Sequence, residues 1–178
     1  MSKYFKIIAQ LLLWFFLVIF QISFISSLNF PFYNLPLLLS ALSFLIIFKK
    51  DNQAIWLVFL VGFIFDIFFF YPFALFTLSL VVCFGILKFL QVNFLTNRSF
   101  YSVLALSLFF ILVFNLVFNL FYFILNLTSA EINFFLFQAT FWQDLAYQLF
   151  FAFILEVIFF YAISLKSRGL RSDFLERT

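Results

Sequence analysis

Apolar runs of roughly the length of a bilayer crossing occupy most of the sequence, and short polar breaks separate them. Apolar residues make up 67% of the 178 positions and charged residues only 10%, whereas a soluble domain carries roughly 45–50% and about 25%. A soluble fold of this length cannot hide so much apolar surface, because its core is limited by its size. We therefore expect an integral membrane protein.

Breaks in the apolar pattern predict an all-α fold, a polytopic integral membrane bundle of six transmembrane helices. A bilayer crossing needs about 20 apolar residues, and prolines or polar loops mark where one crossing ends and the next begins. Residues 1–178 are expected to form a single integral membrane domain. The predicted spans are approximately residues 7–28, 35–48, 54–70, 73–90, 100–127 and 144–165.

Basic residues predict that both the N-terminus and the C-terminus face the cytoplasm. With six crossings and a cytoplasmic N-terminus, all ten Lys and Arg residues lie on the inner side, in agreement with the positive-inside rule. If the short span 35–48 did not cross the bilayer, Lys49 and Lys50 would lie outside. These basic residues flank apolar segments and form no separate patch, so we expect contact with the lipid bilayer and not with nucleic acid.

Residue types needed for most catalytic and cofactor sites are scarce or missing in the sequence. The chain has no His, one Cys, which is Cys83, and three Gly residues. The usual His/Cys metal sites, an intrachain disulfide and a glycine-rich phosphate or dinucleotide loop are therefore not expected. We predict no catalytic activity, no metal and no cofactor, and we interpret Cys83 as a small residue packed against a neighbouring helix.

Asp66 is the clearest polar residue within a predicted span, and an ionised Asp at the centre of a membrane helix costs about 2.5–3.5 kcal/mol on insertion scales. Gly62 lies one turn earlier on the same helix face, where a neighbouring backbone can approach closely. Two interpretations stay open. Asp66 either forms a buried contact or switch with a function, or is a neutral residue that donates one interhelical hydrogen bond. The second predicts that Asp66→Asn is tolerated, because the amide can still donate.

Glu156 lies within the last predicted span, at a depth that can match that of Asp66. Two carboxylates close together can share a proton, as in transporters and acid–base enzymes. Such a pair would make the chain a small intramembrane enzyme. The alternative is a separate structural role for each residue, and the sequence leaves open whether the two helices touch.

Polar residues on one face of the fifth predicted span form a stripe through an otherwise apolar helix. Their spacing places them on the same side of that helix. Side-chain amides hold membrane helices together, so packing within the subunit explains the stripe, and a ligand-lined cavity is the alternative. The stripe consists of Ser107, Asn115, Asn119, Tyr122 and Asn126.

The segment from Val58 to Ile67 contains Gly62 and Asp66 as a G-x-x-x-D motif in the third predicted helix. With this motif the chain resembles the bacterial rod shape-determining protein MreD family, and the resemblance runs over most of the sequence. The family usually has a Gly just after the third helix, where this chain has Phe73. Further similar stretches are Phe70-Tyr71-Pro72-Phe73-Ala74-Leu75, Thr77-Leu78-Ser79, Asn97-Arg98-Ser99-Phe100 and Phe141-Trp142-Gln143.

The resemblance implies a non-catalytic scaffold of the cell-elongation and wall-synthesis machinery, which maintains rod shape in the plasma membrane of a bacterium. The implied partners are an MreC-like single-span protein, the wall-elongation synthases and the MreB-type cytoskeleton. The alternative is the substrate-binding membrane subunit of an energy-coupling-factor vitamin transporter, which also has six helices and cytoplasmic termini. Such subunits present small residues on the first helix, whereas here that helix has only Ala9 among bulky residues.

Overall fold

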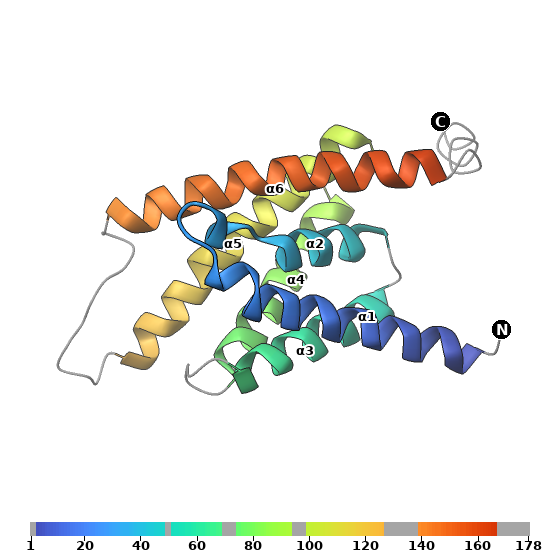
Figure 1. Ribbon diagram of the computed structural model, residues 1–178, viewed down its shortest axis with the longest axis horizontal. Helices are drawn as coiled ribbons and strands as arrows, with labels where there is room; N and C mark the ends of the chain where they lie inside the picture. Colours follow the sequence, from blue (N-terminus) through green and yellow to red (C-terminus); the bar gives the residue numbers. More distant parts are fainter. Residues whose placement is uncertain (1–2, 49–50, 69–73, 94–98, 127–138, 167–178) are drawn as a thin grey trace.

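The chain is all-α: the computed structural model describes residues 3–48, 51–68, 74–93, 99–126 and 139–166, and no strand occurs among them (Figure 1). This confirms that the fold is all-α. Six α-helices and two short 3₁₀ helices follow one another along the described ranges. They are α1 (Lys3–Ser23), η1 (Ile25–Ser27), η2 (Phe32–Asn34), α2 (Leu37–Phe48), α3 (Asp51–Phe68), α4 (Leu75–Asn93), α5 (Phe100–Asn126) and α6 (Ala139–Lys166).

Most of the helix ends lie close to those predicted, but α1 ends earlier and α6 begins earlier than expected. After α1 the chain continues as η1, where the hydroxyl groups of Ser26 and Ser27 donate to backbone carbonyls four and three residues earlier. Serine hydroxyls compete in this way with the helical hydrogen bonds, which explains why the helix stops although the sequence stays apolar. No Pro or Gly lies between Ala139 and Asp144, so α6 starts before its predicted span.

Three helices are long and apolar enough to cross a membrane by length and composition, namely α4, α5 and α6. The apolar parts of the other three, among the residues described, are shorter. They cover Leu12–Ser27, Phe32–Phe48 and Gln53–Phe68. The chain is thus an all-helical protein with membrane-spanning character.

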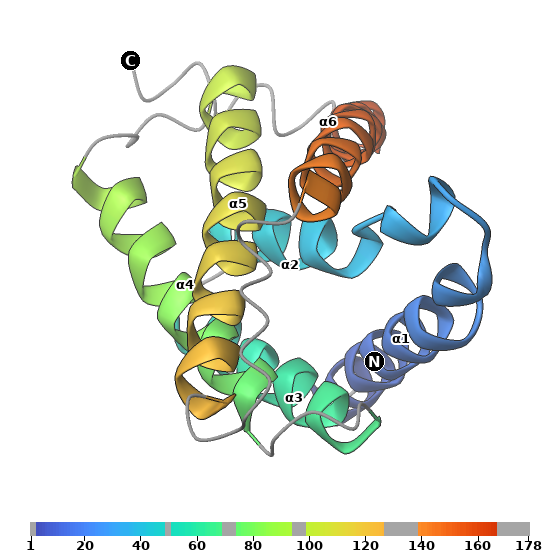
Figure 2. The ribbon, with the colours of Figure 1, turned by 90° about the vertical axis from the view of Figure 1, so that its left-hand side faces the viewer.

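α2 lies at the centre of the fold, in contact with each of the other five α-helices (Figure 2). A helix enclosed on all sides must carry no charged or large polar side chain, and α2 consists only of Leu, Ile, Phe, Ala and Ser. Its small residues Ser40 and Ser43 are fully buried between neighbouring helices. Enclosure by protein accounts for a helix of only 12 residues.

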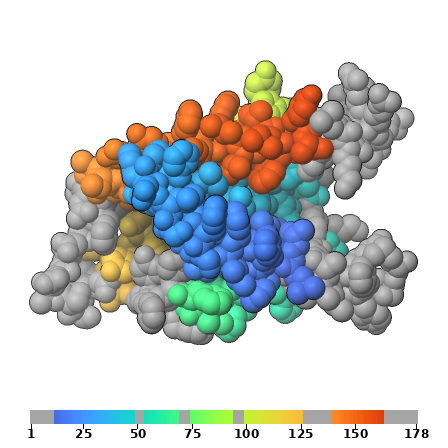
Figure 3. All heavy atoms as spheres, viewed as in Figure 1, coloured from blue at the N-terminus to red at the C-terminus, as the bar shows by residue number. Residues whose placement is uncertain are grey.

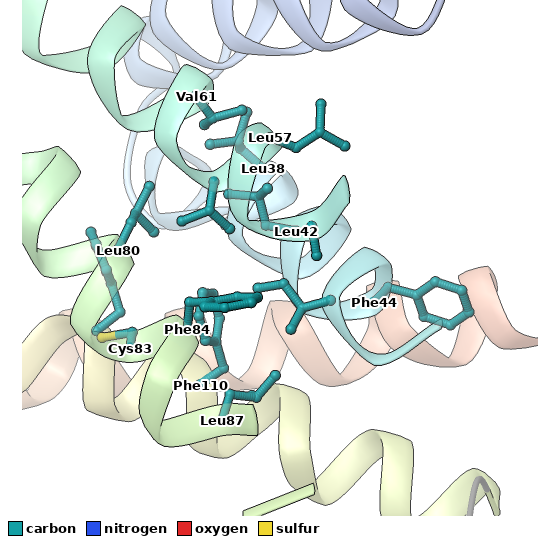
Figure 4. Close-up of a cluster of buried hydrophobic side chains, with 14 of the residues drawn as sticks. Leu38, Leu42, Phe44, Leu57, Val61, Leu80, Cys83, Phe84, Leu87 and Phe110 are labelled. Carbon is teal, nitrogen blue, oxygen red and sulfur yellow. The ribbon is translucent and has the colours of Figure 1, made fainter. Parts of the chain in front are cut away.

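The hydrophobic core forms around α2, where side chains of α3, α4 and α5 converge on it (Figure 4). Leu38 and Leu42 of α2 lie near Leu80 of α4 and Phe110 of α5 in this cluster. Cys83 of α4 is also buried here, which confirms its interpretation as a small residue in helix packing.

The connection from α3 to α4 ends at Ala74, whose backbone φ angle of 70° lies in the left-handed region. Its carbonyl oxygen accepts the first hydrogen bond of α4, from the backbone nitrogen of Leu78 at 2.9 Å. The family's glycine corresponds to Phe73, and both Phe73 and the neighbouring Pro72 lie outside the described residues. The left-handed residue that this turn requires is therefore an alanine, although glycine adopts that conformation without a steric penalty.

We expect Ala74→Gly to stabilise the chain by about 0.5–1 kcal/mol. A left-handed conformation costs an L-residue about 1–2 kcal/mol, and glycine relieves it while adding about 0.4–1 kcal/mol of freedom to the unfolded chain. The free energy of unfolding, measured by denaturant titration in mixed micelles, tests this. Ala152→Gly in the interior of α6 serves as the control and should destabilise, since glycine there gains nothing. Equal losses at both positions would contradict the assignment of strain to Ala74.

Candidate functional site

α3 and α4 approach each other closely at Gly62. A Cβ atom placed on Gly62 would lie 2.6 Å from the backbone Cα of Thr77 in α4, closer than real Cβ atoms come. The nearest atom belongs to the backbone, so a side-chain rotation cannot relieve the clash. The prediction that Gly62 admits a neighbouring backbone is confirmed, and that backbone is the first turn of α4.

Asp66 lies one turn after Gly62 and caps the N-terminus of α4. Its Oδ1 accepts the backbone N–H of Phe76 at 2.8 Å, and its Oδ2 accepts the N–H of Thr77 at 3.0 Å and the Thr77 hydroxyl at 2.5 Å. The first N–H groups of a helix have no partner inside it, and an aspartate at this end is also favoured by the helix dipole. An aspartate normally caps its own helix, whereas here the cap comes from the preceding helix.

These contacts correct the interpretation of Asp66 as a hydrogen-bond donor. Backbone N–H groups can only donate, so both carboxylate oxygens must accept. An amide at this position offers one oxygen and one NH₂ group, and the NH₂ group would face a donor. Asp66→Asn is therefore no longer expected to be neutral.

Glu156 is fully buried in α6, with 1% of its surface exposed, and its contact is with α2 and not with Asp66. The Ser43 hydroxyl lies 2.9 Å from Glu156 Oε1 and 2.8 Å from the Ser40 carbonyl oxygen. Among the described residues, Glu156 Oε2 has no hydrogen-bond partner. Asp66 is bound by α4 and Glu156 by α2, and no hydrogen bond in the described ranges joins the two carboxyl groups.

The Ser43 hydroxyl carries a single hydrogen, but it lies between two acceptors. Either Ser43 shares this hydrogen between the two acceptors, or Glu156 carries a proton and donates it to Ser43, which then donates to the Ser40 carbonyl. The geometry therefore fits a neutral carboxylic acid that joins α6 to α2.

We expect Glu156→Gln to change the free energy of unfolding by less than about 1 kcal/mol, because the Gln amide can replace the donated proton. Ser43→Ala should cost about 1–3 kcal/mol, because it removes the hydroxyl that links the buried carboxyl group to α2. Both values are measurable by denaturant titration in micelles. A Gln variant as unstable as the Ser43→Ala variant would mean that the negative charge itself is required.

The polar stripe on α5 divides into two kinds of contact. Asn115 reaches another helix, since its Nδ2 donates to Gln148 Oε1 of α6 at 2.9 Å and also to the Ile111 carbonyl. Among the described residues, the Asn119 amide donates only to the carbonyl of Asn115 in its own helix, at 2.7 Å. Ser107 likewise donates to a carbonyl of α5. Asn126 is the last residue of α5, and its side chain lies outside the described part.

Asp144 in α6 holds the η2 turn, a contact that the sequence did not predict. Its Oδ1 accepts the hydroxyl of Tyr33 and the side-chain Nδ2 of Asn34, both at 2.8 Å. The hydrogen bond to Asp144 raises the pKa of Tyr33 above its ordinary value, so the phenol stays a donor at neutral pH. The turn between α1 and α2 is thus fixed to the start of α6.

A pocket of about 170 Å³ lies beside this turn, with walls from all six α-helices and η2. Of the six site residues predicted from the sequence, only Asn115 lines it. The other polar lining side chains come from positions that the predictions did not include. The pocket is lined by Gln21, Tyr33, Asn34, Leu35, Pro36, Leu38, Leu39, Phe65, Phe76, Phe114, Asn115 and Gln148.

The described residues contain no group of three or more His, Cys, Asp or Glu side chains that could hold a metal ion. The polar groups of this region thus form helix caps, interhelical hydrogen bonds and the wall of one pocket. Comparison with known proteins adds no relative, because no family model, curated protein or solved structure matches the chain.

Proposed function

We propose that the chain is a non-catalytic membrane scaffold of the bacterial cell-elongation and wall-synthesis machinery, similar to proteins of the MreD family. The observation that carries the proposal is the junction of Gly62 and Asp66 with α4. The G-x-x-x-D motif on which the resemblance depends has a structural use here, because its glycine admits the α4 backbone and its aspartate caps that helix. A motif used in this way belongs to the framework of the protein.

The contacts of the other carboxyl groups support a structural role over a catalytic one. Asp66 binds α4, Glu156 binds α2, and Asp144 binds the η2 turn. Each of these side chains connects two elements of the fold. A scaffold needs a fixed arrangement of helices, which such contacts provide.

The surface of the helices supports binding of partners within the membrane. α1 and α6 form much of one face of the molecule (Figure 3), and their outward side chains are large and apolar. A stable interface needs about 800 Å² from each partner, more than short connections can supply. Partner proteins should therefore bind through helix surfaces. Exposed examples on α1 are Leu12, Phe15 and Phe16, and on α6 Phe150, Phe153 and Ile158.

In this proposal all six helices cross the plasma membrane and both termini lie in the cytoplasm. The three shorter apolar helices then cross as parts of a bundle, with α2 enclosed by protein. We expect Glu131→Cys to be labelled by a membrane-impermeant thiol reagent from outside, and Asp51→Cys and Arg98→Cys to be protected. These variants are made in a Cys83→Ala background. Outside labelling at position 51 would contradict six crossings.

Affinity purification of the tagged chain from native membranes, in mild detergent, tests the scaffold function. We expect an MreC-like single-span protein and wall-elongation synthases to co-purify in stoichiometric amounts. Co-purification of ABC-type ATPase subunits in their place would overturn the proposal and support a transporter. Depletion of the protein should make rod-shaped cells round, and unchanged cell shape would also count against the scaffold.

The pocket beside Asn115 is the observation that favours the second candidate, the substrate-binding subunit of a vitamin transporter. Its volume of about 170 Å³ lies below the roughly 300–1,000 Å³ typical of pockets for vitamin- or drug-sized ligands. α1 also presents bulky side chains where such a subunit would need small ones. These two properties favour the scaffold.

A further inference from the structure

Three phenylalanines from three different helices form an aromatic wall of the pocket. Phe65 of α3 and Phe76 of α4 stack with ring centres 4.5 Å apart and planes inclined by 14°. Phe114 of α5 packs against Phe76 at 5.0 Å with an angle of 57°. Aromatic faces of this kind favour a flat ring as a neighbour.

Carboxamide side chains on α1, α5 and α6 also line the pocket, and they retain hydrogen-bonding groups. Gln21 donates its Nε2 to the Leu35 carbonyl at 3.0 Å, and its buried Oε1 has no partner among the described residues. Asn115 uses its Nδ2 for Ile111 and Gln148. Gln148 accepts that bond with Oε1, and within the described part of the chain its amide hydrogens have no acceptor. The pocket thus offers an acceptor on α1 and a donor on α6.

The described lining residues are all uncharged. Asp66 and Asp144 are the acidic residues nearest in sequence to lining residues of the pocket, and both already accept hydrogen bonds. Asp66 accepts from Phe76 and Thr77 of α4, and Asp144 accepts from the η2 turn. Bringing a charged ligand into such an environment without a partner for its charge is costly. An unpaired buried acceptor, by contrast, gains from a ligand N–H or O–H group.

We propose that this pocket binds a small, flat, uncharged heterocycle with a lactam edge, that is, an N–H donor beside a carbonyl acceptor. The N–H donates to Gln21 Oε1, the carbonyl accepts from the Gln148 amide, and the ring lies against the aromatic wall. A volume of about 170 Å³ equals about five or six water molecules of about 30 Å³ each, which suits a single six-membered ring. This binding site goes beyond the scaffold function and does not depend on it.

Equilibrium dialysis of the full chain in lipid nanodiscs, with uracil as the probe, tests the site. We expect saturable binding of one uracil per chain. The matched ligand is 1,3-dimethyluracil, in which methyl groups replace both N–H donors but the flat ring and both carbonyls stay. We expect dimethyluracil to bind with an affinity at least roughly tenfold lower than that of uracil, because Gln21 Oε1 is again left without a partner.

Two variants on the pocket helices complete the test. Gln148→Leu should weaken uracil binding roughly tenfold or more, because it removes the donor on α6. Asn119→Leu is the control, since Asn119 lies one turn from Asn115 but does not line the pocket, and its described hydrogen bond stays within its own helix. Thermal unfolding first checks that both variants fold like the wild type. The comparison of uracil with dimethyluracil uses the wild type alone, so it does not depend on the folding of a variant.

Several outcomes would overturn the site. They are the absence of uracil binding, equal binding of uracil and dimethyluracil, and an equal loss of binding in the Asn119→Leu control. A neutral lipid that stays bound in native mass spectrometry and disappears in Gln148→Leu would assign the pocket to a lipid headgroup and exclude the heterocycle. Because the dialysis measures a ligand and the affinity purification measures protein partners, either proposal can fail while the other stands.

Discussion

A single methyl group added at position 62 should push α4 away from α3 and destabilise the protein by about 3 kcal/mol. In Gly62→Ala the new Cβ meets the Thr77 backbone at 2.6 Å, so one of the two helices must move. Overpacking in a tight interior costs about 1–3 kcal/mol and occasionally more, and here the shift also disturbs the cap that Asp66 provides. The free energy of unfolding in mixed micelles measures the loss.

Gly85 provides the matched control for this substitution. It also lies within a helix, α4, but a Cβ placed there meets nothing within 4 Å. Gly85→Ala should therefore be neutral or stabilise by up to about 1 kcal/mol, the difference in helix propensity between the two residues. If both Ala variants had the same stability, the close approach at Gly62 would have no energetic importance.

The second large effect is expected for Asp66→Leu, which should destabilise the protein by about 3–5 kcal/mol. The change leaves the N–H groups of Phe76 and Thr77 and the Thr77 hydroxyl without the acceptor that they share. Each unsatisfied buried group costs about 1–3 kcal/mol, and lipid offers no replacement partner. Thermal unfolding and denaturant titration of the purified variant measure the effect.

Two further substitutions rank the contributions within this cap. Asp66→Asn keeps one acceptor oxygen and should lose about 1–3 kcal/mol, between the wild type and the Leu variant. Thr77→Val removes only the hydroxyl contact, keeps the size of the side chain, and should lose about 1 kcal/mol. An Asn variant as stable as the wild type would restore the donor interpretation of Asp66.

The presence and order of the helices were predictable because long apolar runs and polar breaks depend on residues that are close in sequence. The early end of α1 was not, since it depends on the hydrogen bonds of two serine hydroxyls and not on hydrophobicity. The short α2 was predicted as a span from its flanking lysines. Its enclosure by five helices is a property of the tertiary fold, which no local pattern contains.

Gly62 was predictable because a glycine among bulky residues of a membrane helix is explained by a close backbone contact. The role of Asp66 was harder to predict. The sequence shows a polar residue and its position, but not whether its partner donates or accepts a hydrogen bond. One signal was present. Ala74, just before α4, cannot cap a helix with its side chain, and this indicates a need for an outside acceptor.

The candidate pocket was predicted only at Asn115. Helical periodicity places Asn115 and Asn119 on one face, but it cannot show that the Asn119 amide turns back to its own backbone. The partners of Asn115 and Asp144 are 33 and about 110 residues away along the chain, so their contacts arise only when the helices pack. Gln21 was visible as a polar residue in the first span, without any indication of its neighbours.

The cap supplied by Asp66 has a consequence for the biogenesis of the protein. Because the opening amides of α4 find their acceptors on the preceding helix, α4 alone would carry unpaired N–H groups into the lipid, each at a cost of several kcal/mol. During translation α3 emerges first and brings Asp66 to the membrane before the first turn of α4 exists. In the six-span arrangement proposed above, the insertion machinery should therefore release the two helices into the bilayer together, as a helical hairpin. A nascent chain interrupted between them should be a substrate for membrane quality-control proteases.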